Sequence, residues 1–99
     1  MRDFNKAIDL NPGYAQAFSE RGRIYLSLGG GSGRVERALE DFNEAIRLDS
    51  QLAAAYGNRA IAYSQLDQPA AAERDIRTAE TLGLDIEPLR ELISDLRGD

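Results

Sequence analysis

The chain has 99 residues, enough for one small domain, and its 42% hydrophobic and 29% charged residues are typical of a globular protein rather than a disordered one. It contains no cysteine and no histidine, which excludes disulfides and thiolate chemistry and removes the commonest general base and metal ligand. Its net charge of −5 argues against nucleic-acid binding, because lysine and arginine must neutralise the phosphates in such complexes.

Apolar residues recur at helical spacing along most of the chain, and Gly, Pro, Asn and Asp interrupt this pattern at intervals. The pattern predicts six helices, at residues 2–11, 13–28, 34–48, 51–66, 69–82 and 86–97. Pro69 suits the first turn of the fifth helix, where its missing N–H is not needed. Asp67 or Gln68 is expected to cap that helix, and Asp67 is the better cap. The connections are short, so neighbouring helices are expected to pack antiparallel.

Two kinds of internal match divide the chain into repeats. LNPGYAQAFSERGRIYLSLG, which starts at Leu10, matches LDSQLAAAYGNRAIAYSQLD, which starts at Leu48, and DFNKAIDLNP matches DFNEAIRLDS with the same offset. ALEDFNEAIRLD, which starts at Ala38, matches AERDIRTAETLG, which starts at Ala72, so this second offset is shorter by four positions. The shorter offset gives the length of the unit, and the additional residues therefore lie between Leu28 and Ala38. The sequence GGGSG falls in this interval and is typical of a flexible joint.

The repeat resembles the tetratricopeptide repeat, whose unit of about 34 residues forms two helices with the pattern W-x2-L-G-x2-Y followed by A-x3-F. The two copies read Phe18-x2-Arg21-Gly22-x2-Tyr25 followed by Ala38-x3-Phe42, and Tyr56-x2-Arg59-Ala60-x2-Tyr63 followed by Ala72-x3-Ile76. The resemblance implies an all-α fold, namely a right-handed α-solenoid of antiparallel helix pairs with about six helices, in one domain over residues 1–99.

The same resemblance divides the chain into four parts. These are the second helix of a partial repeat (1–12), a repeat with the glycine-rich insertion (15–52, insertion 29–33), a further repeat (53–84) and a capping helix (86–97). The capping helix is expected to turn Leu89, Leu92, Ile93 and Leu96 towards the last repeat. Because the chain starts within a repeat, we expect it to be a segment of a longer array, or its first helix to be covered by a neighbouring molecule.

Small residues are expected to face large ones between the two helices of each pair. Gly22 and Ala60 allow the helices to approach closely, and the rings of Tyr25, Phe42 and Tyr63 are expected to fill the remaining space. This packing predicts a stack of hairpins with a concave side.

The resemblance implies that the first helix of each pair lines a concave groove that binds a peptide. The positions left over by the core are Gln16, Ser19, Glu20, Arg23 and Ser27 in the first copy, and Ala54, Gly57, Asn58, Ile61 and Gln65 in the second. The alternative is that these residues form an ordinary solvated helix surface.

Two further readings concern single residues. YGNRAIAY resembles a stretch of co-chaperone repeat domains in which an Asn at the place of Asn58 binds the carboxylate of a chaperone tail. That clamp also needs a Lys and an Asn from the preceding repeat, and here those places hold Ser19 and Arg23. Arg21, Arg23 and Arg59 could meet an acidic peptide. The alternative, which we favour, is that these arginines pair within the chain with residues such as Glu20, Asp41 or Asp75.

Two motifs suggest chemistry but have simpler explanations. GGGSGR before a helix resembles a phosphate-binding loop, but Gly33-Arg34-Val35 departs from the required Gly-Lys-Ser/Thr. Glu36, Glu40 and Glu44 lie four residues apart and could hold a divalent cation, but a solvated helix face explains them better. No Ser or Tyr has a histidine partner, so we expect no enzyme, no cofactor and no metal.

The sequence therefore predicts a protein-binding scaffold that holds a peptide or a partner helix in its groove. The alternative function is a structural segment of a longer array that associates with itself, including a homo-oligomer formed through the N-terminal half repeat. Nucleic acid is not an expected partner because of the negative net charge. A membrane is not an expected partner either, because no apolar run reaches the ~20 residues of a membrane span. The N-terminal sequence has no signal-peptide core, so a cytoplasmic location is expected.

Overall fold

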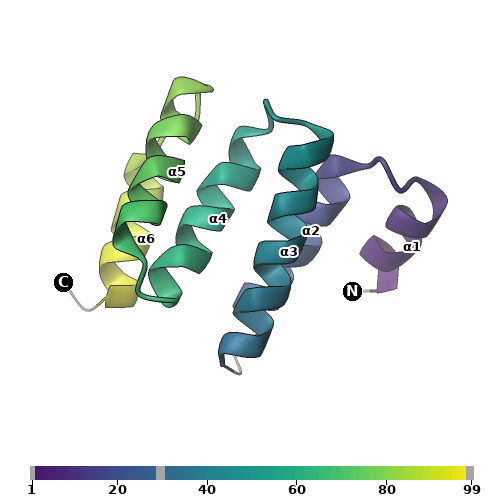
Figure 1. Cartoon of the computed structure of the whole chain (residues 1–99), viewed down its shortest axis with the longest axis horizontal. Helices are drawn as coiled ribbons and strands as arrows, with labels where there is room; N and C mark the ends of the chain where they lie inside the picture. Colours follow the sequence, from purple (N-terminus) through teal and green to yellow (C-terminus); the bar gives the residue numbers. More distant parts are fainter. Residues whose placement is uncertain (1, 29–30, 98–99) are drawn as a thin grey trace.

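The computed structural model describes residues 2–28 and 31–97, and these form six α-helices and no strand (Figure 1). The helices are α1 (Arg2–Leu10), α2 (Ala15–Ser27), α3 (Ser32–Leu48), α4 (Ala53–Gln65), α5 (Pro69–Thr81) and α6 (Glu87–Arg97). Helix α2 pairs with α3 and α4 pairs with α5, and the pairs stack through contacts of α4 with α2 and α3. The predicted all-α stack of six helices is confirmed.

The helices α2, α4 and α6 begin one or two residues later than predicted, for one local reason. In each preceding turn a side chain accepts a hydrogen bond from the backbone two residues further on: Gly13 N–H to Asn11 Oδ1 (3.2 Å), Gln51 N–H to Asp49 Oδ1 (3.0 Å) and Glu87 N–H to Asp85 Oδ1 (3.2 Å). Such turns satisfy the backbone in a non-helical conformation and delay the helix start.

The helix α3 begins at Ser32 rather than at the predicted Arg34, so the end of the glycine-rich insertion lies in the first turn of the helix. Gly31 precedes the helix with a φ of 94°, a conformation that glycine adopts without steric cost. Gly29 and Gly30 lie outside the described residues. The N-cap of α5 also differs from the preferred prediction, Asp67. The N-cap residue is Gln68, and its side chain makes no capping hydrogen bond. Asp67 lies in the preceding turn with a left-handed φ of 57°.

The core confirms the predicted contact between small and large residues. A Cβ atom at Gly22 would lie 2.6 Å from Cε1 of Phe42, and Phe42 is 0% exposed, so α2 and α3 approach as closely as they do because residue 22 lacks a side chain. Tyr25 and Tyr63 are only half-buried and pack against the edge of the same core rather than filling its centre.

The helix α6 covers α4 at the end of the stack opposite α1 (Figure 1). Its residues Leu89 and Ile93 are buried together with Ile86 in the preceding turn. Leu92 packs at the edge of this core, but Leu96 is 48% exposed, so its predicted place on the packed side was wrong. Ile93 is therefore the last buried residue of α6 among those described.

Candidate partner-binding groove

A hollow of about 390 Å³ crosses α2 between α1 and α4, and we call it the α2 groove. It is lined by Phe4, Gln16, Ser19, Glu20, Arg23, Ile24, Leu52, Ala54 and Asn58. Three elements therefore contribute: α1 gives one aromatic side chain, α2 gives five residues along one face, and the start of α4 with its preceding turn gives the rest. The walls are mainly apolar and carry a few polar groups, as is usual for a ligand-binding surface.

One hydrogen bond joins the two repeats across the floor of the groove. Asn58 Nδ2 donates to Ser19 Oγ at 3.2 Å, and Ser19 is only 3% exposed. At the rim, Gln16 Nε2 donates to Glu20 Oε1 at 3.4 Å, one turn apart on the same helix. In the part of the chain that the structure describes, no carboxylate pairs with Arg23, which is exposed at the same rim.

Two arginines at equivalent repeat positions lie outside the groove and each join three helices. Arg21 binds Asp41 through Nε (3.0 Å) and Nη2 (2.7 Å), and its Nη1 donates to Asn5 Oδ1 at 3.0 Å. Arg59 binds Asp75 in the same two-pronged way, at 2.8 Å for both contacts, and its Nη1 donates to Asn43. These bonds confirm the prediction that Arg21 and Arg59 pair within the chain.

The environment of both arginines favours the charged form. The hydrogen bonds to Asp41 and Asp75 raise the pKa of Arg21 and of Arg59, although burial acts in the opposite direction. The guanidinium groups also lie over aromatic rings, 5.5 Å from the centre of Phe18 for Arg21 and 5.6 Å from that of Tyr56 for Arg59. Their donors are therefore directed into the fold rather than towards a ligand.

A family model described as a TPR repeat matches residues 32–67, which comprise α3, α4 and the turn between them. The helices on either side continue the same antiparallel packing, and the arginine bonds repeat from one unit to the next. The match and the six helices of the described residues fit a TPR-type repeat protein. No curated protein sequence matches it. TPR repeats generally mediate interactions between proteins, and the family is typically a non-enzymatic scaffold.

The fold brings together six of the ten positions that were predicted for the groove, namely Gln16, Ser19, Glu20, Arg23, Ala54 and Asn58. Ser27, Gly57, Ile61 and Gln65 do not line the α2 groove. Ser27 is exposed beyond it and its hydroxyl donates to the Ile24 carbonyl at 2.9 Å, Gln65 is exposed at the end of α4, and Ile61 is buried in the core at 3% exposure.

The C-terminal segment covers part of the second repeat that was expected to be open. A Cβ atom at Gly57 would lie 3.0 Å from Leu84 Cδ2 and 3.6 Å from Leu89 Cδ2, so the turn before α6 and α6 itself occupy this side of α4. Position 57 therefore belongs to a packed interface. The open surface is centred on α2.

The apolar lining of the groove was not predicted. Phe4, Ile24 and Leu52 are all half-buried and contribute to it. In the sequence, Phe4 matches the core residue Phe42, so its pattern indicated a buried position. Helix α2 covers Phe42, whereas no helix among the described residues covers Phe4 in the same way, and the local sequence pattern is alike at both positions.

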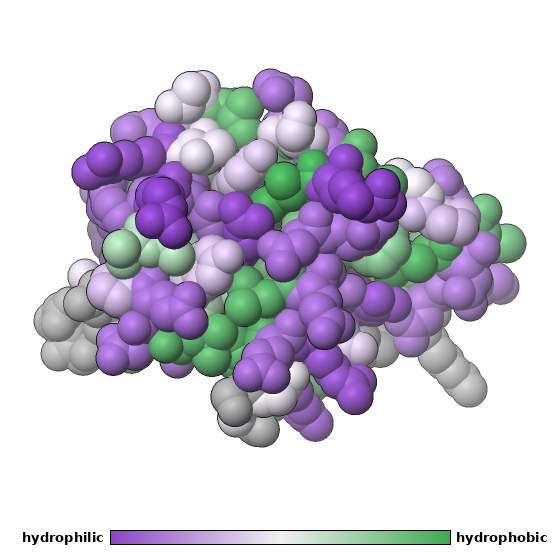
Figure 2. Space-filling view, in the orientation of Figure 1, coloured by the Kyte–Doolittle hydropathy of each residue, from purple (hydrophilic) through white to green (hydrophobic). Residues whose placement is uncertain are grey.

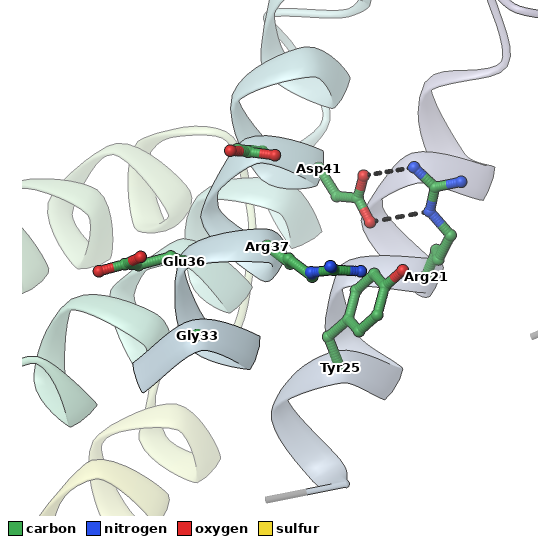
Figure 3. A pocket seen from close by; sticks show the side chains of 7 residues that line it. Arg21, Tyr25, Gly33, Glu36, Arg37 and Asp41 are labelled. Atoms are coloured by element: carbon green, nitrogen blue, oxygen red, sulfur yellow. Dashed lines mark hydrogen bonds and ion pairs between the residues drawn. The ribbon is translucent and has the colours of Figure 1, made fainter. Parts of the chain in front are cut away.

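A second, more polar hollow of about 570 Å³ lies between α2 and α3 (Figure 3). The Arg21–Asp41 pair closes one side, and Arg37 extends towards Tyr25 across it (Figure 3). Glu36 and Glu40 also line this hollow, but in the described residues no group of three or more acidic side chains is placed to hold a metal ion, and Glu44 instead pairs with Arg47. Its charged groups are paired or solvated.

No helix in residues 2–28 and 31–97 combines the length and the apolar character of a membrane-spanning segment.

Proposed function

We propose that this TPR-type chain is an interaction scaffold that holds a peptide or a partner helix in the α2 groove. The observation that carries this proposal is the hollow itself, in which side chains of α1, of α2 and of α4 with its preceding turn converge on mainly apolar walls that carry a few polar groups. Because the groove is built on packed helices, little ordering entropy is lost on this side when a partner binds.

The lining indicates the chemistry of the partner segment. Phe4, Ile24 and Leu52 offer an apolar surface for one or two apolar side chains. Arg23 offers a charge that an acidic residue next to them can meet, since within the described residues it has no carboxylate partner. The amide of Asn58 is already bonded to Ser19, so a clamp for a free carboxylate at Asn58 is not favoured.

The test uses peptides selected from a random phage-displayed library against the immobilised full chain. Ala54→Trp is expected to fill the groove, because Ala54 is exposed on its wall, and to weaken the selected peptides at least ~10-fold, or about 1.4 kcal/mol. Arg23→Ala is expected to weaken those peptides that carry an acidic residue.

Matched controls are available on α5. Ala70→Trp and Arg74→Ala change exposed residues of the same types away from the groove, and they are expected to leave the affinities unchanged. Peptides that bind equally well to Ala54→Trp and to the unchanged chain, with no loss in Arg23→Ala, would show that the α2 groove is not the binding surface.

A further inference from the structure

A small hollow of about 180 Å³ lies between α5 and α6, which Figure 1 shows side by side, and we call it the α5–α6 hollow. Its inner wall consists of Ala72, Ile76 and Ile93, which are all buried. Glu73 and Arg90 bind each other across it and are partly exposed, so they form its outer rim. The other lining residues are Ser64, Pro69 and Ser94. The hollow shares no lining residue with the α2 groove.

The first repeat carries larger apolar residues at the positions that line this hollow in the second. Leu26, Val35, Leu39 and Phe42 stand where the second repeat has Ser64, Pro69, Glu73 and Ile76. In the first repeat all four side chains belong to the apolar core or pack against it. Each residue of the second repeat is smaller or polar, so the equivalent space beside α6 stays unfilled. The hollow is therefore a feature of this sequence and not of the repeat fold in general.

Ser64 is the least expected of these residues. Its Oγ is buried and has no hydrogen-bond partner among the described residues, whereas the equivalent Leu26 is packed in the core. A buried hydroxyl without a partner lowers the stability of the fold, so serine at this place has a cost that leucine would not have. Rotation about its one side-chain torsion turns the hydroxyl towards the hollow that the residue lines. A ligand hydroxyl can then supply the missing hydrogen bond.

The size and the lining of the hollow fit one aromatic ring. An apolar protein cavity of about 150 Å³ holds a benzene molecule, so the α5–α6 hollow has room for the ring of one side chain. The guanidinium of Arg90 at the rim can lie over that ring, as Arg59 lies 5.6 Å from the ring centre of Tyr56. Figure 2 shows that polar side chains separate the apolar patches on the face that it displays, and a single inserted side chain suits such a surface.

We propose that the α5–α6 hollow binds one tyrosine side chain of a separate partner protein. The ring packs on Ile76 and Ile93 below Arg90, and its hydroxyl bonds to Ser64. The chain itself does not supply the ring, because its four tyrosines and three phenylalanines all lie in the described residues and none of them lines the hollow. This site does not depend on the function proposed for the α2 groove, since the two hollows are lined by different residues.

The first experiment titrates N-acetyltyrosinamide into the isotope-labelled full chain. The methyl shifts of Ala72, Ile76 and Ile93 are expected to change and to saturate. N-acetylphenylalaninamide is expected to bind about 3-fold more weakly, because it lacks the hydroxyl that bonds to Ser64. N-acetylleucinamide is expected to bind at least ~5-fold more weakly than the tyrosine compound, because it offers neither the hydroxyl nor a ring face to Arg90.

Two variants close the hollow from different sides. Ser64→Leu restores the residue of the first repeat, and it is expected to abolish the shift changes and to raise the thermal midpoint, since it removes the unsatisfied hydroxyl. Its control is Gln65→Leu, at the exposed neighbouring position outside the hollow. Ser94→Trp covers the rim from an exposed position and is expected to weaken binding at least ~10-fold without unfolding the chain. Its control is Asp95→Trp, which is exposed outside the hollow.

Four results would overturn the proposal. The first is the absence of saturable shift changes at Ile76 and Ile93, or their persistence in both Ser64→Leu and Ser94→Trp. The second is a set of changes centred on Ala54, which would place the tyrosine compound in the α2 groove. The third is binding of free phenol without binding of N-acetyltyrosinamide, which would make the hollow a site for small molecules. The fourth is self-association in light scattering that is lost in Tyr14→Ala, because Tyr14 is 44% exposed and a second copy would then be the partner.

Discussion

Arg21 and Arg59 occupy the position where the family pattern has leucine, and they replace an apolar contact by a set of directed bonds. Each guanidinium binds the aspartate of its own hairpin in a two-pronged geometry and reaches the asparagine of the preceding second helix. One side chain thus sets the distance between three helices. Such bonds specify geometry more than they add stability, because burying an ion pair carries a desolvation cost.

Removing one member of such a pair is expected to destabilise the fold strongly. Arg59→Met leaves Asp75 without its partner at 6% side-chain exposure, and we expect a loss of about 3 kcal/mol in the free energy of unfolding, measured by urea denaturation. Arg47→Met is the control: its pair with Glu44 is exposed, so its removal is expected to change little.

The double variant Arg59→Met/Asp75→Leu tests whether the loss of stability comes from the unpaired charge of Asp75. It removes both charges and is expected to recover most of the stability, since an apolar pair can replace a buried ion pair. If Arg59→Met lowers the free energy of unfolding no more than Arg47→Met does, the bond between Arg59 and Asp75 is not needed for the stability of the fold.

Gly22 makes a second residue-scale prediction. Gly22→Ala places a methyl group against the fully buried ring of Phe42, and the strain is expected to exceed the gain in helix propensity, for a net loss of about 1–2 kcal/mol. Gly33→Ala is the control, because nothing lies within 4 Å of its Cβ position and it lies in the first turn of α3. That change is expected to stabilise the chain by about 0.5–1 kcal/mol. The midpoints of thermal unfolding of the two variants test this. Equal changes in midpoint for Gly22→Ala and Gly33→Ala would contradict the close contact between residue 22 and Phe42.

At the scale of elements, α6 is held to the stack by apolar residues and by one polar contact to α5. Ile86, Leu89 and Ile93 are buried, and Arg90 binds the carboxylate of Glu73 through two bonds of 3.2 and 3.0 Å. Arg77 also approaches Glu73, but its contact is longer, at 3.6 Å. The polar contact therefore ties the capping helix to the second helix of the last hairpin.

This contact predicts a pH dependence. The hydrogen bonds from Arg90 lower the pKa of Glu73 from its ordinary value of 4.5, and the charge of Arg77 adds to this. A carboxyl group whose pKa is lowered on folding contributes stability above its ordinary pKa and loses it as the pH falls through the lowered value. Because both side chains are partly exposed, we expect a contribution below about 1 kcal/mol, lost below pH 4.5.

The carboxyl carbon shift of Glu73, followed through an NMR titration, checks this. Arg90→Gln is expected to move the pKa of Glu73 back up towards 4.5, and Arg77→Gln is expected to move it less. A larger effect of Arg77→Gln would mean that the two arginines exchange roles in solution.

At the scale of the whole molecule, the stack is 41 Å long and only 18 Å thick, so each helix contacts mainly its neighbours. Helix α4 contacts α2, α3, α5 and α6, whereas the contacts of α1 are with α2. In such an array local stability follows the number of packed neighbours.

We therefore expect a gradient of hydrogen exchange along the chain. The amides of α3 and α4 are expected to exchange slowest and those of α1 fastest, because α1 opens without disturbing the other pairs. Exchange measured by NMR on the full chain checks this, and protection of α1 equal to that of α3 would contradict the neighbour-by-neighbour description.

Much of the fold followed from local pattern. The six helices and their pairing were predicted because the helical period and the order of small and large residues recur in both repeats. Helix starts were less accurate, because a side-chain bond to the backbone in the turns competes with the first helical turn. Of the groove residues, those on the face of α2 were predicted, since a shared helix face can be read from spacing.

The sequence by itself determined which side chains share a face and which helices pair, since both depend on periodicity and on contacts between neighbouring segments. Only the tertiary structure decided which of those faces stays open. Gly57 and Ile61 are covered by the C-terminal segment and the core, whereas Phe4 and Leu10 are left accessible although their equivalents in α3 are more deeply buried. The physical reason is that exposure depends on whether another helix occupies the adjacent place, and a residue's own sequence pattern is the same in either case.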